Sequence, residues 1–308
     1  MPYSKSYLQS LVLANPFIEA NVEKVLRLGE ILSFLFHDPR LQGKLVLKGG
    51  TALNLCYAPL PRLSLDIDLD YIGSVDAATT RRERSEILQL IADVLMRMGY
   101  APSPRSRGYY ALSSQVFAYQ NAMRNKDVLK IEINFMDRVH LEAIQEKNVI
   151  LFGKPLKVET LQKEELYGSK IAALIDRHKP RDLYDVNYAI VHHNLGDEDK
   201  LKTAIVFYLA MDGLFEFPSS ALAGIDSFTY SDIRAELKPV LAKDDDFELD
   251  EARSRVKSYL SSLTLSPKEQ AFLLSAKRKE FDFSLLSSDS GFIQRMNQHP
   301  WVLWKQRS

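Results

Sequence analysis

The spacing of apolar residues predicts helices first and strands next along the beginning of the chain. Over residues 7–36 they recur every three or four positions, which predicts two helices separated near Pro16. The apolar run 45–47 then predicts a short strand, and residues 51–57 a short helix. Residues 64–70 alternate strictly between apolar and polar, as expected for a half-buried strand.

The remaining pattern divides the chain in two. A charged amphipathic helix is predicted over residues 76–99, and strands are predicted over 109–119, 128–136 and 149–158, the last with a turn at Gly153. From residue 160 onward the spacing is helical, beginning with helices over 161–177 and from about 181. We therefore predict an α+β protein, with a mixed-sheet domain over residues 1–158 and a mainly helical domain over 159–308.

Two glycines follow the first predicted strand. Gly49 and Gly50 allow backbone conformations and close ligand approaches that other residues do not. The helix predicted to begin at Thr51 leaves its first N–H groups without intrahelical partners, and such groups bind phosphate. A lone Gly-Gly is also typical of an ordinary turn. Its position between a strand and a helix favours a phosphate-binding loop.

Acidic residues share one face of the next predicted strand. Alternation places Asp66 and Asp68 on the face opposite Ile67. Two neighbouring carboxylates repel each other unless a cation lies between them, and Mg²⁺ in nucleotide sites is held by one or two carboxylates together with phosphates. A solvated edge strand would show the same alternation. The succession of glycine loop and Asp-x-Asp strand favours a metal-nucleotide site.

These motifs resemble a known family. Gly-Gly-Thr followed by Ser-x-Asp-Ile-Asp-Leu is similar to the nucleotidyltransferase superfamily, and specifically to the AbiEii / MenT group of toxin–antitoxin nucleotidyltransferases. In that superfamily the glycines hold the triphosphate and the two aspartates hold metal ions. The resemblance implies these roles for Gly49, Gly50, Asp66 and Asp68.

A second motif resembles the same group. The segment from residue 170 to 185 carries a lysine and a downstream aspartate that complete the active site in that family, and these match Lys170 and Asp185. A lysine there would offset triphosphate charge, and the aspartate would orient it or activate the attacking hydroxyl. The basic residues around 177–181 are compatible with binding either RNA or triphosphate.

Three further residues are candidates for this site. Glu132 lies on the polar face of a neighbouring predicted strand, and it is either a third metal ligand or a plain surface glutamate. Thr51 and Ser64 lie close enough in sequence to the motifs to bond phosphate or a metal ligand. In some members of the family a serine at the position of Ser64 is phosphorylated, which the resemblance implies would block the site.

Composition narrows the setting. The 308 residues include 40 Lys and Arg against 40 Asp and Glu, so only a local basic patch could bind nucleic acid. The single cysteine, Cys56, excludes an internal disulfide and fits a reducing compartment, and its apolar surroundings predict burial rather than nucleophilic duty. No apolar run reaches the ~20 residues of a membrane span. We expect a cytoplasmic protein with no membrane contact.

The resemblance completes the functional expectation. It implies a toxin that uses Mg²⁺ or Mn²⁺ to transfer NMP from an NTP to an acceptor, with tRNA as that acceptor, in a toxin–antitoxin or abortive-infection defence against phage. It also implies a cognate AbiEi/MenA-like antitoxin. Two alternatives stay open at this point: a nucleotidyltransferase that modifies a small-molecule hydroxyl, and a non-catalytic nucleotide-binding partner protein.

Overall fold

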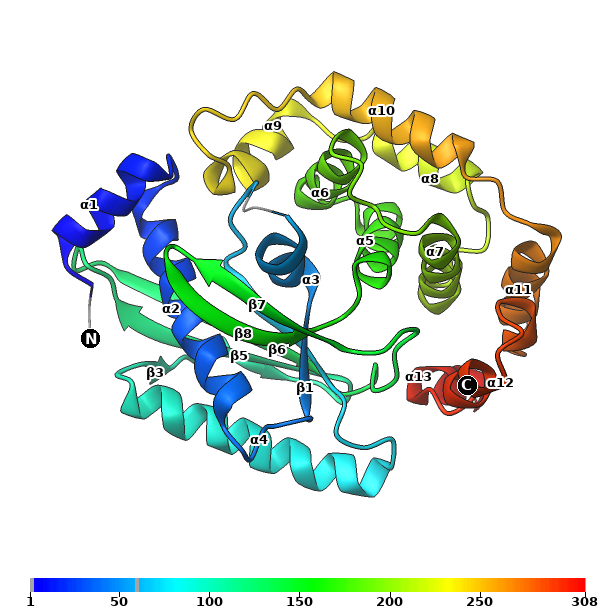
Figure 1. Ribbon diagram of the computed structural model, residues 1–308, viewed down its shortest axis with the longest axis horizontal. Helices are drawn as coiled ribbons and strands as arrows, with labels where there is room; N and C mark the ends of the chain where they lie inside the picture. Colours follow the sequence, from blue (N-terminus) through cyan, green and yellow to red (C-terminus); the bar gives the residue numbers. More distant parts are fainter. Residues whose placement is uncertain (1–2, 59–60, 308) are drawn as a thin grey trace. The chain divides into compact units, whose positions relative to one another are not determined.

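The computed structural model describes residues 3–58 and 61–307, which form two compact units. The sheet unit comprises Met1–Arg138, Ile144–Leu161 and Val240–Asp244. The helical unit comprises Val139–Ala143, Gln162–Pro239 and Asp245–Ser308. The main boundary between the units therefore lies at the end of the last strand. Two short segments fall outside this division, since Val139–Ala143 belongs to the helical unit and Val240–Asp244 to the sheet unit. Figure 1 shows the elements of both units.

The sheet unit is built on one mixed sheet with the strand order β3-β5-β6-β2-β1-β8-β7, in which β4 also pairs with β5. The β2–β6 and β1–β8 pairs are parallel and the other pairs antiparallel. This arrangement confirms the predicted α+β class. The strands are β1 Leu45–Lys48, β2 Asp66–Tyr71, β3 Ala101–Pro102, β4 Arg107–Gly108, β5 Leu112–Gln120, β6 Lys126–Asn134, β7 Gln145–Leu151 and β8 Lys154–Thr160.

Helices cover one face of this sheet. On α2, the guanidinium of Arg27 lies 4.5 Å from the ring centroid of Tyr119, and on α4, Glu83 accepts a hydrogen bond from Tyr71. Because alternate strand residues share a face, these helices lie on the side of Ile67, and the aspartates of β2 project from the opposite side. The helices of this unit are α1 Lys5–Ala14, α2 Glu19–His37, α3 Gly49–Ala52, the π-helix η1 Leu53–Tyr57 and α4 Ala77–Arg97.

Two local predictions are corrected. The helix predicted to begin at Thr51 begins at Gly49 and continues as the π-helix η1. Gly49 has a φ of +66°, a conformation that glycine adopts without strain. The short strand predicted over 149–158 is two strands, the β7–β8 hairpin, and the turn predicted at Gly153 lies between them. Its two-residue turn has φ of 47° at Phe152 and 78° at Gly153, the positive pair typical of tight hairpins.

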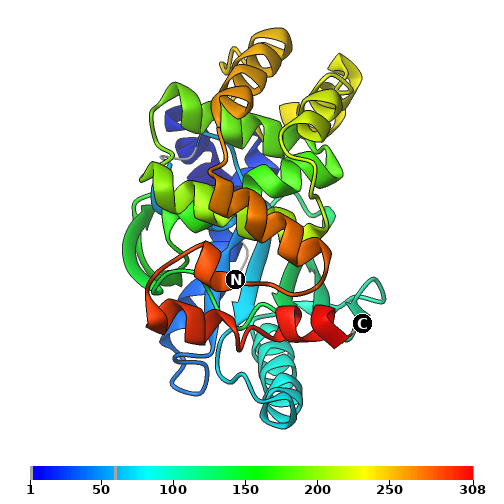
Figure 2. The same ribbon diagram turned by 90° about the vertical axis from the view of Figure 1, so that its right-hand side faces the viewer.

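The helical unit contains no named strand among its described residues, as predicted. Its first helix begins at Lys163, two residues later than predicted, because β8 extends to Thr160, whose hydroxyl donates to the Leu47 carbonyl. Figure 2 shows the last helices of this unit in orange and red. The elements are α5 Lys163–Arg177, α6 Pro180–Val191, α7 Glu198–Asp212, α8 Ser219–Ile225, α9 Tyr230–Asp232, η2 Ile233–Leu237, η3 Lys238–Val240, α10 Leu249–Ser262, α11 Pro267–Lys277, η4 Phe283–Leu285, α12 Ser290–Met296 and α13 Pro300–Arg307.

No helix within the described ranges is both long and apolar enough to cross a membrane. Burial raises the pKa of the Cys56 thiol to about 12, so this thiol stays protonated at neutral pH. The expectation that Cys56 is not a nucleophile is consistent with this shift.

Close helix packing generates a stability prediction. A Cβ on Gly168 of α5 would lie 2.4 Å from the Ala204 Cβ of α7. Gly168→Ala should therefore lower the free energy of unfolding by roughly 1–3 kcal/mol through overpacking, although the same change in an open helix raises it by about 1 kcal/mol. Urea denaturation measures both. Gly291→Ala in α12, where the nearest atom is 3.4 Å away, is the control. Equal effects of the two substitutions would contradict the packing argument.

Candidate active site

The glycine loop lies directly against the carboxylate strand. A Cβ on Gly49 would lie 2.5 Å from Asp68 Oδ2, and a Cβ on Gly50 would lie 2.8 Å from Arg62 Nη2. Gly49, whose φ is +66°, therefore has no room for a side chain against Asp68, whereas a side chain at Gly50 would require the end of Arg62 to move. Asn54 Nδ2 donates to the Gly50 carbonyl at 2.6 Å and ties the loop to the π-helix that follows.

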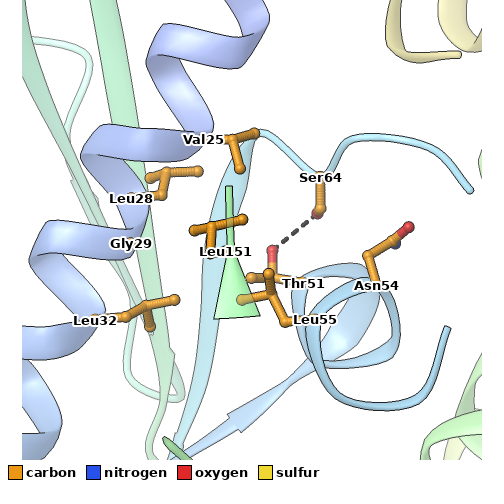
Figure 3. Close-up of a pocket in the computed structure, with 9 residues that line it drawn as sticks. All are labelled: Val25, Leu28, Gly29, Leu32, Thr51, Asn54, Leu55, Ser64 and Leu151. Carbon is orange, nitrogen blue, oxygen red and sulfur yellow. Dashed lines mark hydrogen bonds between the residues drawn. The ribbon is translucent and has the colours of Figure 1, made fainter. Parts of the chain in front are cut away.

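Thr51 and Ser64 connect the loop to the start of β2. Thr51 Oγ1 lies 2.8 Å from Ser64 Oγ and 2.5 Å from the Asp66 carbonyl oxygen. Thr51 is buried, so its hydroxyl holds the loop and the strand together in this structure. Figure 3 shows the bond between the two hydroxyls.

A pocket behind the loop is mainly aliphatic. Its walls come from α2, the loop and its π-helix, Ser64 and the end of β7, as Figure 3 shows. Such walls pack the loop against α2 and offer no cation for a triphosphate. The lining residues are Val25, Leu28, Gly29, Leu32, Thr51, Asn54, Leu55, Ser64 and Leu151.

The strand register brings the predicted metal ligands together. Asp68 on β2 is directly opposite Glu132 on the parallel strand β6, and Asp66 is opposite Lys130. Directly paired residues project from the same face, so Asp66, Asp68 and Glu132 form one carboxylate group on the face opposite α2 and α4. On the other side of β2, Lys48 is opposite Asp68.

Two lysines neutralise part of the negative charge on this face. The sequence motifs assigned neither of them a role. Lys48 Nζ lies 2.6 Å from Asp70 Oδ1 and 3.6 Å from Asp137 Oδ2. Burial opposes the charge of Lys48, yet Asp70 and Asp137 outweigh it and raise the pKa of the ammonium above its ordinary value. Asp70 is thus engaged in an ion pair. Lys130 Nζ lies 3.3 Å from Asp66 Oδ2 and 3.2 Å from Glu132 Oε2.

Asp68 is left between these two ion-paired sets. Burial raises its pKa above the ordinary carboxyl value, and repulsion from Asp66 and Glu132 adds to the increase, while both lysines act in the opposite direction. A cation bound among the three carboxylates would relieve that repulsion. Their oxygen atoms are the donors that Mg²⁺ and Mn²⁺ prefer, so the donor set fits such an ion.

The arrangement nevertheless differs from a closed metal site. Among residues 3–58 and 61–307, no three His, Cys, Asp or Glu side chains are grouped closely enough to hold a metal ion. Lys130 takes part of that position by bridging Asp66 and Glu132. A divalent cation would have to draw the carboxylates together and displace this ammonium.

The second predicted pair lies in the helical unit. Lys170 Nζ of α5 lies 2.8 Å from Asp182 Oδ1 and 3.2 Å from Asp185 Oδ2 on α6. Arg177 also binds Asp182, with Nε 2.8 Å from Oδ2. Burial alone would raise the pKa of Asp182, but Lys170 and Arg177 hold it below its ordinary value. The sequence motif matched Lys170 and Asp185 and assigned no role to Asp182, which lies one turn earlier than Asp185 on the same helix.

Lys130 generates a prediction about metal affinity. Removing its charge in Lys130→Met should tighten binding of Mn²⁺ roughly tenfold, because a positive charge at ion-pair distance costs on the order of 1–4 kcal/mol. Calorimetric titration with Mn²⁺ measures the affinity. Lys126→Met removes an equal charge from the exposed start of the same strand and should change little. An unchanged affinity in Lys130→Met would contradict competition between this lysine and the cation.

Asp182 generates a prediction about stability and pH. Its folded pKa is depressed, so its contribution is complete above the pKa of the unfolded carboxyl, near 4, and is lost as the pH falls through the folded value. Asp182→Asn should cost about 3–5 kcal/mol at neutral pH, because it leaves a buried lysine without its nearest carboxylate, and the cost should shrink in acid. Denaturation at several pH values measures this. The exposed Asp199→Asn, in a surface pair with Lys202, should cost no more than about 1 kcal/mol. A pH-independent loss would contradict the ion-pair explanation.

Comparison with known proteins assigns the family. The family model described as nucleotidyl transferase AbiEii toxin, type IV TA system, matches residues 33–278. The solved structure of MenT4, a nucleotidyltransferase toxin from Mycobacterium tuberculosis H37Rv, is similar in fold, with a TM-score of 0.64 and 15% sequence identity over 98% of this chain and 99% of that chain. No curated protein matches the chain. The family match confirms the resemblance inferred from the motifs, and the chain belongs to the AbiEii family of type IV toxin–antitoxin nucleotidyltransferases.

Proposed function

We propose that this nucleotidyltransferase transfers NMP from an NTP to the 3′ end of an RNA, with tRNA as the acceptor, and that the reaction requires Mg²⁺ or Mn²⁺. The observation that supports this most is the carboxylate group of Asp66, Asp68 and Glu132 beside the Gly49–Gly50 loop on one face of the sheet. Phosphate-binding backbone and metal-binding oxygens thereby meet at one place.

Each candidate site residue in the sheet unit has a role in this proposal. The backbone N–H groups at the start of the helix formed by α3 and η1 bind the triphosphate, and the absence of side chains on Gly49 and Gly50 permits close approach. Asp66, Asp68 and Glu132 hold the divalent cation. When bound, the cation stabilises charge on the attacking and leaving oxygens of the displacement. Thr51 and Ser64 keep the loop in place beside these carboxylates.

We assign the remaining charge compensation to the helical unit. Lys170 offsets phosphate charge, and Asp185 orients Lys170 or accepts the proton of the attacking hydroxyl. The contacts of Lys170 with Asp182 and Asp185 support this assignment, since a buried ammonium held by two carboxylates is fixed in position. Asp182 and Arg177 act as positioning residues in this scheme.

The biological role follows from the family. A type IV toxin–antitoxin nucleotidyltransferase implies an antitoxin as a partner, and we propose an AbiEi/MenA-like protein in that place, in a cytoplasmic defence against phage. The fold similarity to a nucleotidyltransferase toxin, MenT4, supports the same role.

A labelling experiment tests the reaction. Purified protein is incubated with total bacterial tRNA, Mg²⁺ and each of the four α-³²P-labelled NTPs, and the RNA is separated on a gel. We expect one or more nucleotides to label tRNA, with activity reduced at least about a hundredfold in Asp66→Ala and in Asp68→Ala, since a catalytic metal contributes several kcal/mol. Asp93→Ala on the exposed side of α4 is the matched control.

The outcomes separate the parts of the proposal. Full activity in a folded Asp66→Ala or Asp68→Ala protein would exclude the metal assignment. Labelling that survives chelation of divalent ions would do the same. Absence of label on tRNA with every nucleotide would refute the tRNA acceptor, and labelled products from a panel of small hydroxyl compounds would then identify the acceptor class.

A further inference from the structure

One segment of the sheet unit carries a charge distribution unlike the rest of the chain. Residues 99–126, here named the acid-free edge, contain four basic residues and no acidic residue, in a protein with 40 basic and 40 acidic side chains. The segment contains β3, β4 and β5 and the turns around them, at one end of the sheet order. Its basic residues are Arg105, Arg107, Arg124 and Lys126.

Strand register connects this edge with the carboxylate group. Arg107 on β4 is directly opposite Ser114 on β5, and Ser114 is directly opposite Glu132 on β6. Together with the Asp68–Glu132 pair, this forms a continuous row across four strands, whose side chains project from one face. With strands about 4.8 Å apart, Arg107 lies roughly 10 Å from Glu132 and roughly 14 Å from Asp68 along the row.

The arginines at this edge remain available for an anion. Arg107 is exposed, and its Nη1 donates to the carbonyls of Pro104 and Ser106, at 2.8 Å and 3.0 Å, so its Nε and Nη2 groups remain for an anion. Arg105 is exposed. Within the part of the chain that the structure describes, neither guanidinium forms an ion pair with a carboxylate.

Two tyrosines follow the arginines on a fixed turn. Tyr109 and Tyr110 are 61% and 71% exposed, which is high for large aromatic side chains. Their backbone is held in place, because the Tyr109 N–H donates to the Leu112 carbonyl and Arg84 of α4 donates to the carbonyls of both tyrosines. The rings are thus presented to solvent from a rigid support, as base-stacking platforms are.

We propose that the acid-free edge is the binding track for the single-stranded end of the RNA acceptor, with Arg105 and Arg107 on its phosphates and Tyr109 and Tyr110 stacked on its bases. Guanidinium groups bind phosphate, exposed rings stack on bases, and the row of paired strands leads from Arg107 to the carboxylates. This inference rests on the proposed function and deepens it, since it names the surface that the acceptor occupies.

Binding of RNA without NTP tests the proposal. The dissociation constant of 5′-labelled total bacterial tRNA is measured for the full-length protein by filter binding, between about 50 and 200 mM salt. Arg105→Ala/Arg107→Ala should weaken binding at least about tenfold and reduce the salt slope by roughly 1.4, as expected for two contacts to single-stranded phosphates. Tyr109→Ser/Tyr110→Ser should weaken binding at least about fivefold with an unchanged salt slope.

Further variants guard against loss of folding and against general charge effects. Arg105→Glu reverses an exposed charge without removing the bonds of Arg107 and should weaken binding, while Arg107→Lys keeps the charge. Lys154→Ala/Lys157→Ala on β8, toward the other end of the sheet order, removes the same charge and should leave binding near wild type. NTP binding, followed by the thermal shift with a non-hydrolysable NTP, should remain unchanged in the acid-free edge variants.

The results distinguish this proposal from the proposed function. If wild type labels tRNA but the acid-free edge variants bind and label it equally well, the track is refuted and the proposed function stands. The same conclusion follows if the β8 variant weakens binding as much as the arginine variant. If binding depends on the acid-free edge but no nucleotide is transferred, the track stands and the reaction is refuted. A wild type that neither binds nor labels tRNA overturns both.

Discussion

The mutual repulsion of carboxylates on one face of the sheet is the constraint to which the candidate site responds. Parallel pairing of β2 with β6 puts Asp68 beside Glu132, and the alternation of β2 adds Asp66 and Asp70 to the same side. The structure offsets this charge with two lysines of unlike setting. Lys48 closes a salt bridge with the buried Asp70, whereas Lys130 forms its ion pairs at a partly exposed position. The face is therefore divided into a part neutralised around the buried Asp70 and a more exposed part, around Asp66 and Glu132, where a cation can compete.

The same crowding explains the glycine loop. With Asp68 Oδ2 at 2.5 Å from the position of a Cβ on Gly49, any other residue would push the loop away from the carboxylates. The helix starts at this glycine, so its first N–H groups begin beside Asp68. The glycine at position 49 thus allows the loop and the Asp68 carboxylate to lie close together. Strand β1 is followed by two glycines, and the Asp68 carboxylate occupies the space that a side chain on Gly49 would need.

The helical unit handles charge differently, because its lysine is buried. Lys170 is held by Asp182 and Asp185, and Arg177 supplies the second cation that Asp182 needs. Interior charges are tolerated when each has a partner, and this cluster contains two cations and two carboxylates in mutual contact. The proline at the start of α6 and the left-handed His178 after α5 set the turn between the two helices. That turn brings the acids of α6 to the lysine of α5.

The sequence alone identified the candidate site residues and predicted which face of each strand they occupy. Period-two alternation in β2 and β6, the two glycines after β1 and the family motif at Lys170 are local properties. They predicted the α+β class and the candidate residues of the glycine loop, the carboxylate strands and the Lys170–Asp185 pair. Tertiary structure decided the partners. The pairing of Asp66 with Lys130 joins residues that are distant along the chain, and it depends on strand order and register, which alternation does not specify. Only the tertiary structure showed the roles of Lys48, Lys130 and Asp182 and the row from Asp68 to Arg107. Ion pairs and strand rows depend on distances in space and not on spacing in the chain.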